Sequence, residues 1–105
     1  MLYIDVPDHN DSFSRVVLED REVLLRFTYN AREDYWAFGV YDNEETPILT
    51  MCKIVPNFPL TFFYDGLDLP KGIFGAVTDL AQIGREAFNT KAARFVFIPL
   101  SDLTD

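Results

Sequence analysis

The stretch EVLLRFTYNAREDYWAFGVY, residues 22–41, decides the fold because it encodes two strands joined by a bend. Apolar and polar side chains alternate along both arms, and a period of two is typical of a half-buried antiparallel strand. One face of the first arm collects Val23, Leu25, Phe27 and Tyr29, and one face of the second collects Trp36, Phe38 and Val40. We therefore predict a β-hairpin that forms the nucleus of the core.

The bend itself, NARED at residues 30–34, gathers polar groups that could also be a reactive site. Asn30 favours a turn, because its side chain can bond its own backbone and it tolerates a left-handed conformation. Arg32, Glu33 and Asp34 are then the exposed tip of the hairpin. We interpret the stretch as a structural bend.

Further alternating segments surround this hairpin. They predict strands at 2–6, 13–18, 47–55, 60–64, 73–77 and 93–100. Segment 78–89 has apolar residues at helical spacing behind Thr78 as an N-cap, but Gly84 disfavours a helix by roughly 1 kcal/mol relative to Ala. A short helix and an ordered loop both stay open there. The expected fold is mainly β, a small antiparallel β-sandwich or partly open barrel with at most one short helix, in one domain spanning 1–105.

Charge and composition exclude several classes of function. Nine basic and seventeen acidic residues give a net charge of −8, which repels nucleic-acid phosphates and anionic membranes. The first residues carry no signal-peptide pattern, and no apolar run approaches the ~20 residues that cross a bilayer. We expect a soluble protein made in a cytoplasm, without nucleic-acid or membrane partners. Cys52, the one cysteine, permits no internal disulfide and suits a reducing compartment.

Few residues offer chemistry. His9, the one histidine, falls in a polar loop, and Cys52 is expected to be a small, half-buried strand residue alternating with Ile48, Thr50 and Ile54. Paired carboxylates could cleave glycosidic bonds, but the acids here sit mostly in turns. The loops at 8–11 and 65–68 could bind a surface Ca²⁺, although neither fits the twelve-residue calcium loop. We expect no catalytic, cofactor or metal site.

The segment NFPLTFFYDGLDL, residues 57–69, is rich in large apolar side chains and is broken by proline. Alternation can bury only about half of such side chains in the chain's own core. Aromatic residues are enriched where proteins bind one another. We hypothesise that part of this segment, with an exposed edge strand, contacts partner proteins, although the whole segment could also fold into the core. The candidate contact residues are Phe58, Leu60, Phe62, Phe63, Tyr64 and Leu67.

Motifs in order along the chain give it a family resemblance. A strand ending in YN is followed by Arg32, an aromatic YW strand, a short acidic turn and PIL; LPKG at 69–72 and FVFIPL at 95–100 follow. In this order and spacing the sequence resembles the small baseplate plug proteins of contractile-tailed bacteriophages, of the cyanophage type. The positions that carry the resemblance, as determinants of the fold, are Tyr29, Asn30, Arg32, Trp36, Pro47, Leu69, Pro70 and Gly72.

The resemblance implies a β-rich structural protein of a virion, without catalytic residues or cofactors. Such a plug would lie in the tail baseplate near the tail axis, in a multi-subunit assembly with hub, spike and tube-end proteins. It would be made in the cytoplasm of the bacterial host. The residue patterns point the same way, because surplus apolar groups without a reactive site favour an assembly component.

Two other classes of function stay open from the residues. Tyr35 and Tyr41 fall opposite the Trp36 face and could stack on sugars, which would make the chain a small carbohydrate- or ligand-binding β-domain for host recognition. An enzyme would need two carboxylates with matched roles, and no pattern selects such a pair.

Overall fold

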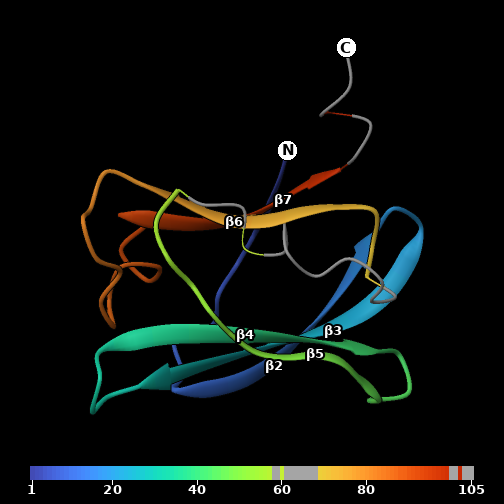
Figure 1. Cartoon of the computed structure of the whole chain (residues 1–105), viewed down its shortest axis with the longest axis horizontal. Helices are drawn as coiled ribbons and strands as arrows, with labels where there is room; N and C mark the ends of the chain where they lie inside the picture. Colours follow the sequence, from blue (N-terminus) through green and yellow to red (C-terminus); the bar gives the residue numbers. More distant parts are fainter. Residues whose placement is uncertain (58–59, 61–68, 100–101, 103–105) are drawn as a thin grey trace.

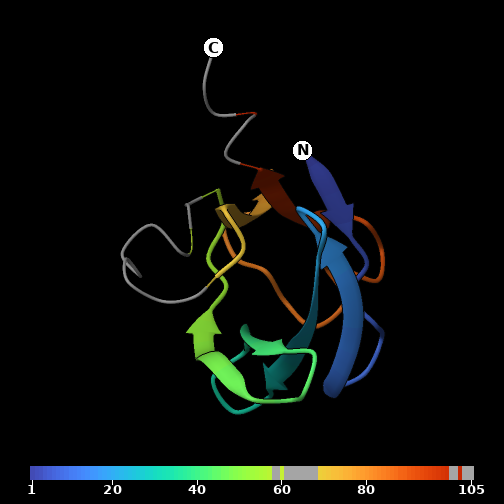
Figure 2. The same cartoon turned by 90° about the vertical axis from the view of Figure 1, so that its right-hand side faces the viewer.

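Two antiparallel sheets face each other in the computed structural model, which describes residues 1–57, 60, 69–99 and 102 (Figures 1 and 2). One sheet has the strand order β1-β7-β6 and the other the order β2-β3-β4-β5, and they do not close into a barrel. The predicted mainly β sandwich is therefore confirmed. Its strands are β1 (Leu2–Ile4), β2 (Asp11–Leu18), β3 (Arg21–Asn30), β4 (Tyr35–Asp42), β5 (Pro47–Lys53), β6 (Gly72–Thr78) and β7 (Ala93–Pro99).

The central hairpin is formed by β3 and β4, as its sequence predicts. Phe27 stands opposite Phe38 and Tyr29 opposite Trp36 in the register, so the aromatic faces of both strands point the same way. Asn30 belongs to the end of β3 rather than to the loop, and its side-chain Oδ1 accepts the Glu33 backbone N–H at 3.0 Å. This bond makes the bend at 31–34 an ordered turn.

A tight turn of two residues connects β2 to β3. Glu19 and Asp20 both have positive φ, 52° and 62°. Two such residues in succession are the signature of a type I′ turn, whose twist matches that of the flanking strands. The pair Leu18–Arg21 closes this hairpin, and the register runs without interruption back to Asp11 opposite Thr28.

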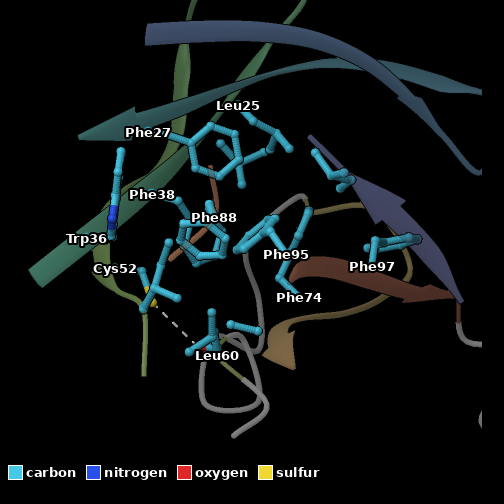
Figure 3. Close-up of a cluster of buried hydrophobic side chains, with 14 of the residues drawn as sticks. Leu25, Phe27, Trp36, Phe38, Cys52, Leu60, Phe74, Phe88, Phe95 and Phe97 are labelled. Carbon is cyan, nitrogen blue, oxygen red and sulfur yellow. Dashed lines mark hydrogen bonds between the residues drawn. The ribbon is translucent and has the colours of Figure 1, made fainter. Parts of the chain in front are cut away.

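Aromatic rings fill the space between the sheets (Figure 3). The Phe95 ring on β7 lies 5.0 Å from both Phe27 and Phe38 across the sandwich, with edge-to-face geometry. Phe74 on β6 contacts Phe38 at 5.4 Å. Such pairs add about 0.5–1.5 kcal/mol each beyond the area that they bury. The two sheets are therefore held together mainly by phenylalanine.

A bulge in β5 changes the phase that the sequence predicts there. Leu49 and Cys52 face the core, 5% and 7% exposed, whereas Thr50 and Met51 are exposed. Met51 has φ of 56°, and the register shifts where β5 passes Gly39. The prediction that Thr50 and Cys52 lie on the same face of the strand is therefore wrong. One extra residue in a bulge turns the residues that follow it to the opposite face.

Segment 79–92 is an ordered loop, which resolves the alternatives left open by the sequence. Its ends are fastened by Thr78, whose Oγ1 donates to the Ala92 carbonyl at 2.7 Å and accepts the Leu80 N–H at 3.0 Å. Ile83 and Phe88 are buried, so the apolar residues of this segment contact the core from a loop rather than from one face of a helix. No helix among the described residues is long and apolar enough to span a bilayer.

The remaining differences from the predicted strands lie at their ends. β1 stops at Ile4 rather than at residue 6, and β5 stops at Lys53 rather than at residue 55. The strand predicted at 60–64 falls outside the described residues except for Leu60, which is in a turn.

Candidate partner-binding surface

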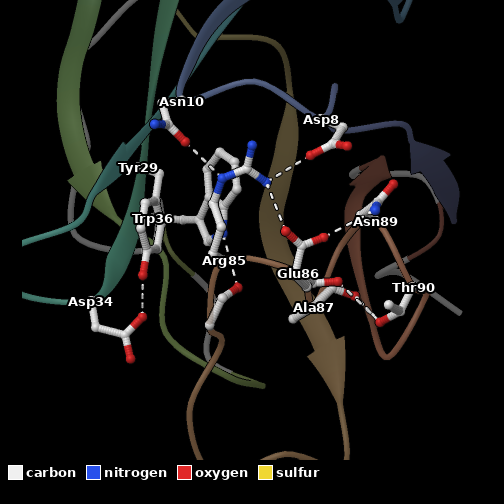
Figure 4. Close-up of polar contacts among 11 residues, drawn as sticks. Asp8, Asn10, Tyr29, Asp34, Trp36, Arg85, Glu86, Ala87, Asn89 and Thr90 are labelled. Carbon is white, nitrogen blue, oxygen red and sulfur yellow. Dashed lines mark hydrogen bonds and ion pairs between the residues drawn. The ribbon is translucent and has the colours of Figure 1, made fainter.

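Arg85, in loop 79–92, connects three parts of the chain (Figure 4). Its Nε donates to Asn10 Oδ1 at 2.6 Å and its Nη1 to Asp8 Oδ1 at 2.8 Å. The guanidinium carbon lies 5.4 Å from the Trp36 ring centre and 6.0 Å from that of Tyr29. A cation over aromatic faces, bonded to acceptors from another loop, fixes position rather than performing chemistry.

The hairpin tip is fastened to the same loop. Asp34 accepts a hydrogen bond from the Tyr29 hydroxyl, and its Oδ2 accepts one from Gln82 Nε2 at 3.0 Å. The bond to the Asp34 carboxylate raises the pKa of the Tyr29 phenol, because it is made by the neutral form. The Trp36 Nε1 donates to the Gly84 carbonyl at 3.0 Å. The polar groups around the bend thus fasten the hairpin tip to loop 79–92, and we call this network the clasp: Tyr29, Asp34, Trp36, Gln82 and Gly84. Asp34 belongs to this network and is not simply an exposed residue at the tip.

Several positions that carry the family resemblance lie in or beside this clasp. Tyr29 and Trp36 pack together with ring centres 5.3 Å apart. Asn30 orders the turn, and its Nδ2 lies 3.4 Å from the Tyr35 hydroxyl. Arg32 is exposed and makes no hydrogen bond or ion pair with a described residue, so nothing in the structure explains its presence.

The other such positions lie at the first residue of a strand or just before it. Pro47 is the exposed first residue of β5, where a missing N–H is tolerated. At the corner before β6, Leu69 packs against the core and Pro70 is buried. Gly72 has φ of 157°, and a Cβ built there would lie 2.4 Å from the Ile98 carbonyl oxygen. The structure gives these residues places at the starts of strands and at a corner, and their role as determinants of the fold stays a prediction.

The groups considered for chemistry do not converge. Among described residues, no three His, Cys, Asp or Glu side chains gather as a metal site. Asp8 pairs with Arg85, whereas Asp11 pairs with Arg26, so the candidate calcium loop at 8–11 directs its carboxylates to different arginines. Cys52 is buried beside the Leu60 carbonyl. The candidate loop at 65–68 lies outside the described residues.

The two tyrosines considered for sugar stacking both have ring contacts. Lys53 Nζ lies 5.0 Å from the Tyr35 ring centre. Phe13 meets the Tyr41 ring edge-on at 5.4 Å, and Tyr41 Cε1 is 3.2 Å from where a Cβ of Gly39 would lie. Rings committed to neighbouring side chains offer less free surface to a sugar, so this geometry favours packing over carbohydrate binding.

Most of the predicted partner-contact residues lie outside the described residues: Phe58, Phe62, Phe63, Tyr64 and Leu67. Their contact with a partner stays a prediction. Leu60, the described member, is 5% exposed and packs into the core (Figure 3). A partner protein cannot reach a side chain buried in this way, so Leu60 does not belong to a contact surface.

Among the strands that the structure describes, three of the four sheet edges are protected against pairing with another chain. On β6, the Phe74 and Ala76 carbonyls accept the backbone N–H groups of Leu60 and Asn57, each at 2.8 Å. β5 is interrupted by its bulge at Met51. β1 is three residues long. Covered, bulged and very short edges are the usual means of preventing unwanted strand pairing.

β2 is the long edge without these protections. It runs from Asp11 to Leu18 without a bulge or proline, and no described segment pairs with its outer side (Figure 2). Phe13 and Val17 on its solvent face are 53% and 62% exposed. The sequence predicts this strand but not which face of it is exposed, because alternation alone does not say which side meets the core.

One comparison with known proteins identifies a family. The family model described as "Cyanophage baseplate Pam3 plug gp18" matches residues 1–100. No curated protein matches this chain. The matched range contains all seven strands of the described fold and both Gly72 and the unprotected edge of β2.

Proposed function

Because this chain belongs to the cyanophage baseplate plug family, we propose that it closes the tail end near the tail axis by binding hub, spike and tube-end proteins. Family membership makes it a structural protein of the virion, located in the tail baseplate. The proposal adds how it attaches: through an open strand edge and exposed aromatic side chains. In this role the chain needs no cofactor and catalyses no reaction.

The unprotected β2 edge carries the proposal. A soluble protein that left a long edge strand unpaired beside an exposed Phe13 would be prone to aggregation, unless a partner covered the edge in the assembly. β6, the long edge strand of the sheet β1-β7-β6, is covered by other residues of the same chain. This difference between two edges of one molecule supports β2 as the contact surface.

Charge supports protein partners over nucleic acid. The chain has a net charge of −8, so a DNA strand passing along the tail axis would be repelled rather than bound. Arg15 and Arg26 on the β2–β3 face are each paired with a carboxylate, of Glu22 and Asp11 respectively. That face is locally neutral and partly apolar, which is typical of surfaces that bind proteins.

Co-purification tests the proposal. The chain is produced together with the hub, spike and tube-end proteins of the same phage, and complexes are isolated and weighed. We expect a stable complex with at least one of them, and loss of that complex in Phe13→Glu, which places a charge on the exposed edge. Val77→Glu is the matched control, because Val77 is 48% exposed on the other sheet.

Two results would contradict the proposal. The first is a chain that binds none of these proteins while folded and concentrated. The second is equal loss of binding in the Phe13 and Val77 variants, because an effect that does not depend on the sheet would argue against β2 as the contact.

A further inference from the structure

We infer that β2 is completed in the assembly by an extended strand from a neighbouring baseplate protein, which carries Lys or Arg beside the turn at Glu19 and Asp20. This inference rests on the proposed function and specifies the partner segment. It would extend the sheet β2-β3-β4-β5 by one strand. Strand addition of this kind obtains affinity from main-chain hydrogen bonds and specificity from the side chains beside them.

The backbone groups available to such a strand follow from the register. The Asn10 carbonyl accepts the Tyr29 N–H at 2.8 Å, one step beyond the pair Asp11–Thr28. In an antiparallel ladder, hydrogen-bonded and non-bonded pairs alternate. Even-numbered residues of β2 therefore bond to β3, and odd-numbered residues turn their N–H and C=O groups outward. The outward residues are Asp11, Phe13, Arg15 and Val17.

Charged side chains on this edge do not protect it. Lysine or arginine reaching into solvent usually discourages a second strand. Here the Arg15 guanidinium is bonded to Glu22, and Asp11 is held by Arg26 at 2.7–2.9 Å, both on the neighbouring strand β3. Because these charges are directed back over the sheet, they leave the outward backbone groups accessible.

Side chains along β2 define what the added strand should carry. On the solvent face, Phe13 and Val17 flank Arg15, so apolar residues of the incoming strand would cover exposed hydrocarbon. On the inner face, the Ser12 hydroxyl is buried and has no hydrogen-bond partner among the described residues. A buried hydroxyl without a partner costs about 1–3 kcal/mol, and a polar side chain on the added strand would satisfy it.

Electrostatics orients the strand and disfavours a second copy. Glu19 and Asp20 are exposed at the end of β2 and make no ion pair with a described residue, so they favour a basic residue beside them. Two copies paired about Ser14 would use all four outward residues of each. That arrangement would set Asp20 opposite Asp8 of the second copy and bring two chains of charge −8 together. A partner with basic residues is therefore the better occupant.

Amide hydrogen exchange tests the inference on the full chain, free and in complex with whichever of the purified hub, spike and tube-end proteins binds it. We expect the outward amides of Phe13, Arg15 and Val17 to exchange at least about tenfold more slowly in the complex. The amides of Ser12 and Ser14, already bonded to β3, are the internal reference and should change little.

Substitutions separate backbone pairing from side-chain contact. Arg15→Pro removes an outward N–H and should weaken binding at least about tenfold, whereas Arg15→Ala keeps it and should weaken binding less. Val17→Pro and Val17→Ala repeat the comparison in case the first proline variant does not fold. Glu19→Gln with Asp20→Asn should weaken binding and flatten its dependence on salt.

The outcomes distinguish this inference from the proposed function. Binding without protection of the outward amides, or equal affinities of the proline and alanine variants, would overturn the inference and leave the proposed function standing. Binding to none of the three proteins would overturn both. A dimer of this chain that the proline variants abolish would show that a second copy occupies the edge, and would overturn the inference.

Discussion

The Trp36 indole N–H donates to the Gly84 carbonyl at 3.0 Å, joining strand β4 to a loop 48 residues later in the chain. Trp36 is 1% exposed, and its ring packs against Phe88 from the same loop at 5.7 Å. Arg85, between these contacts, covers the ring. Loop 79–92 is therefore held by one side chain through both its polar and its apolar atoms.

Trp36→Phe should separate these two contributions. The substitution keeps an aromatic ring in the core but removes the indole N–H, leaving the Gly84 carbonyl without this donor. We expect a loss of about 1–3 kcal/mol in the free energy of unfolding, measured by urea denaturation. Trp36→Ala should cost more, about 3–5 kcal/mol, because it also leaves a cavity.

Leu80→Ala is the control for this loop. Leu80 is 41% exposed, so its truncation should change the unfolding free energy by no more than about 0.5 kcal/mol. If Trp36→Phe were as mild as Leu80→Ala, the hydrogen bond to Gly84 would not contribute to holding the loop.

The central hairpin was predictable because the inner face of each of its two strands is encoded locally. Every second residue from Val23 to Phe27 is apolar and buried, and the same holds from Trp36 to Val40. The two-residue period of apolar side chains and the residue types that favour a turn depend only on neighbours in the sequence. Both can therefore be recognised without knowing the rest of the chain. The family resemblance, carried by such local motifs in order, was predictable for the same reason.

Features that depend on distant contacts were not predictable. Arg85 has no local signal that marks it for Tyr29, Trp36 and Asp8, since these partners come from other parts of the chain. The bulge at Met51 has no local signature either, because it arises where β5 passes Gly39. Which face of β2 is exposed likewise depends on which of its faces the other sheet packs against, and the local sequence does not show this.

Gly72 and Gly84 provide a second prediction. At Gly72 a Cβ would lie 2.4 Å from the Ile98 carbonyl and 2.6 Å from Phe97 Cζ, and φ is 157°. Gly72→Ala should therefore lower the unfolding free energy by several kcal/mol, or prevent folding, because backbone on β7 must move. Thermal unfolding followed by circular dichroism measures the change.

Gly84→Ala is the matched substitution with the opposite expectation. A Cβ at Gly84 meets only Asp34 Oδ1, at 3.9 Å, which is ordinary contact. Alanine there should be neutral or stabilise the protein by about 0.4–1 kcal/mol, because it reduces the freedom of the unfolded chain. A Gly72 variant as stable as the Gly84 variant would show that the β6–β7 approach is not tight.

The Tyr29–Asp34 bond predicts a pH dependence at the alkaline end. The bond to the carboxylate raises the pKa of Tyr29, and nearby Arg85 opposes this shift to a lesser extent. A group whose pKa is higher in the folded state stabilises that state fully below its unfolded value, about 10, and this stability is lost as pH rises through the folded value. Tyr29 should thus ionise later than the free side chain in an NMR titration.

Asp34→Asn should bring the pKa of Tyr29 back toward its ordinary value, because the negative charge that opposes ionisation is gone. Tyr29→Phe should remove this part of the alkaline dependence of stability. A Tyr29 that titrates no later in the native protein than in the Asp34 variant would rule out the bond in solution.

Residues 60 and 63 test whether the aromatic segment predicted to contact partners does so. Leu60 is buried, so Leu60→Asp places an unpaired charge in the core and should unfold the chain or cost at least about 3 kcal/mol. Phe63 is predicted from the sequence to meet a partner, so Phe63→Asp should leave the unfolding free energy within about 1 kcal/mol and weaken binding to hub, spike or tube-end proteins. Denaturation and co-purification measured on both variants give the two readouts. Normal assembly by a folded Phe63→Asp protein would remove this segment from the contact surface, and a strongly destabilised one would assign Phe63 to the core.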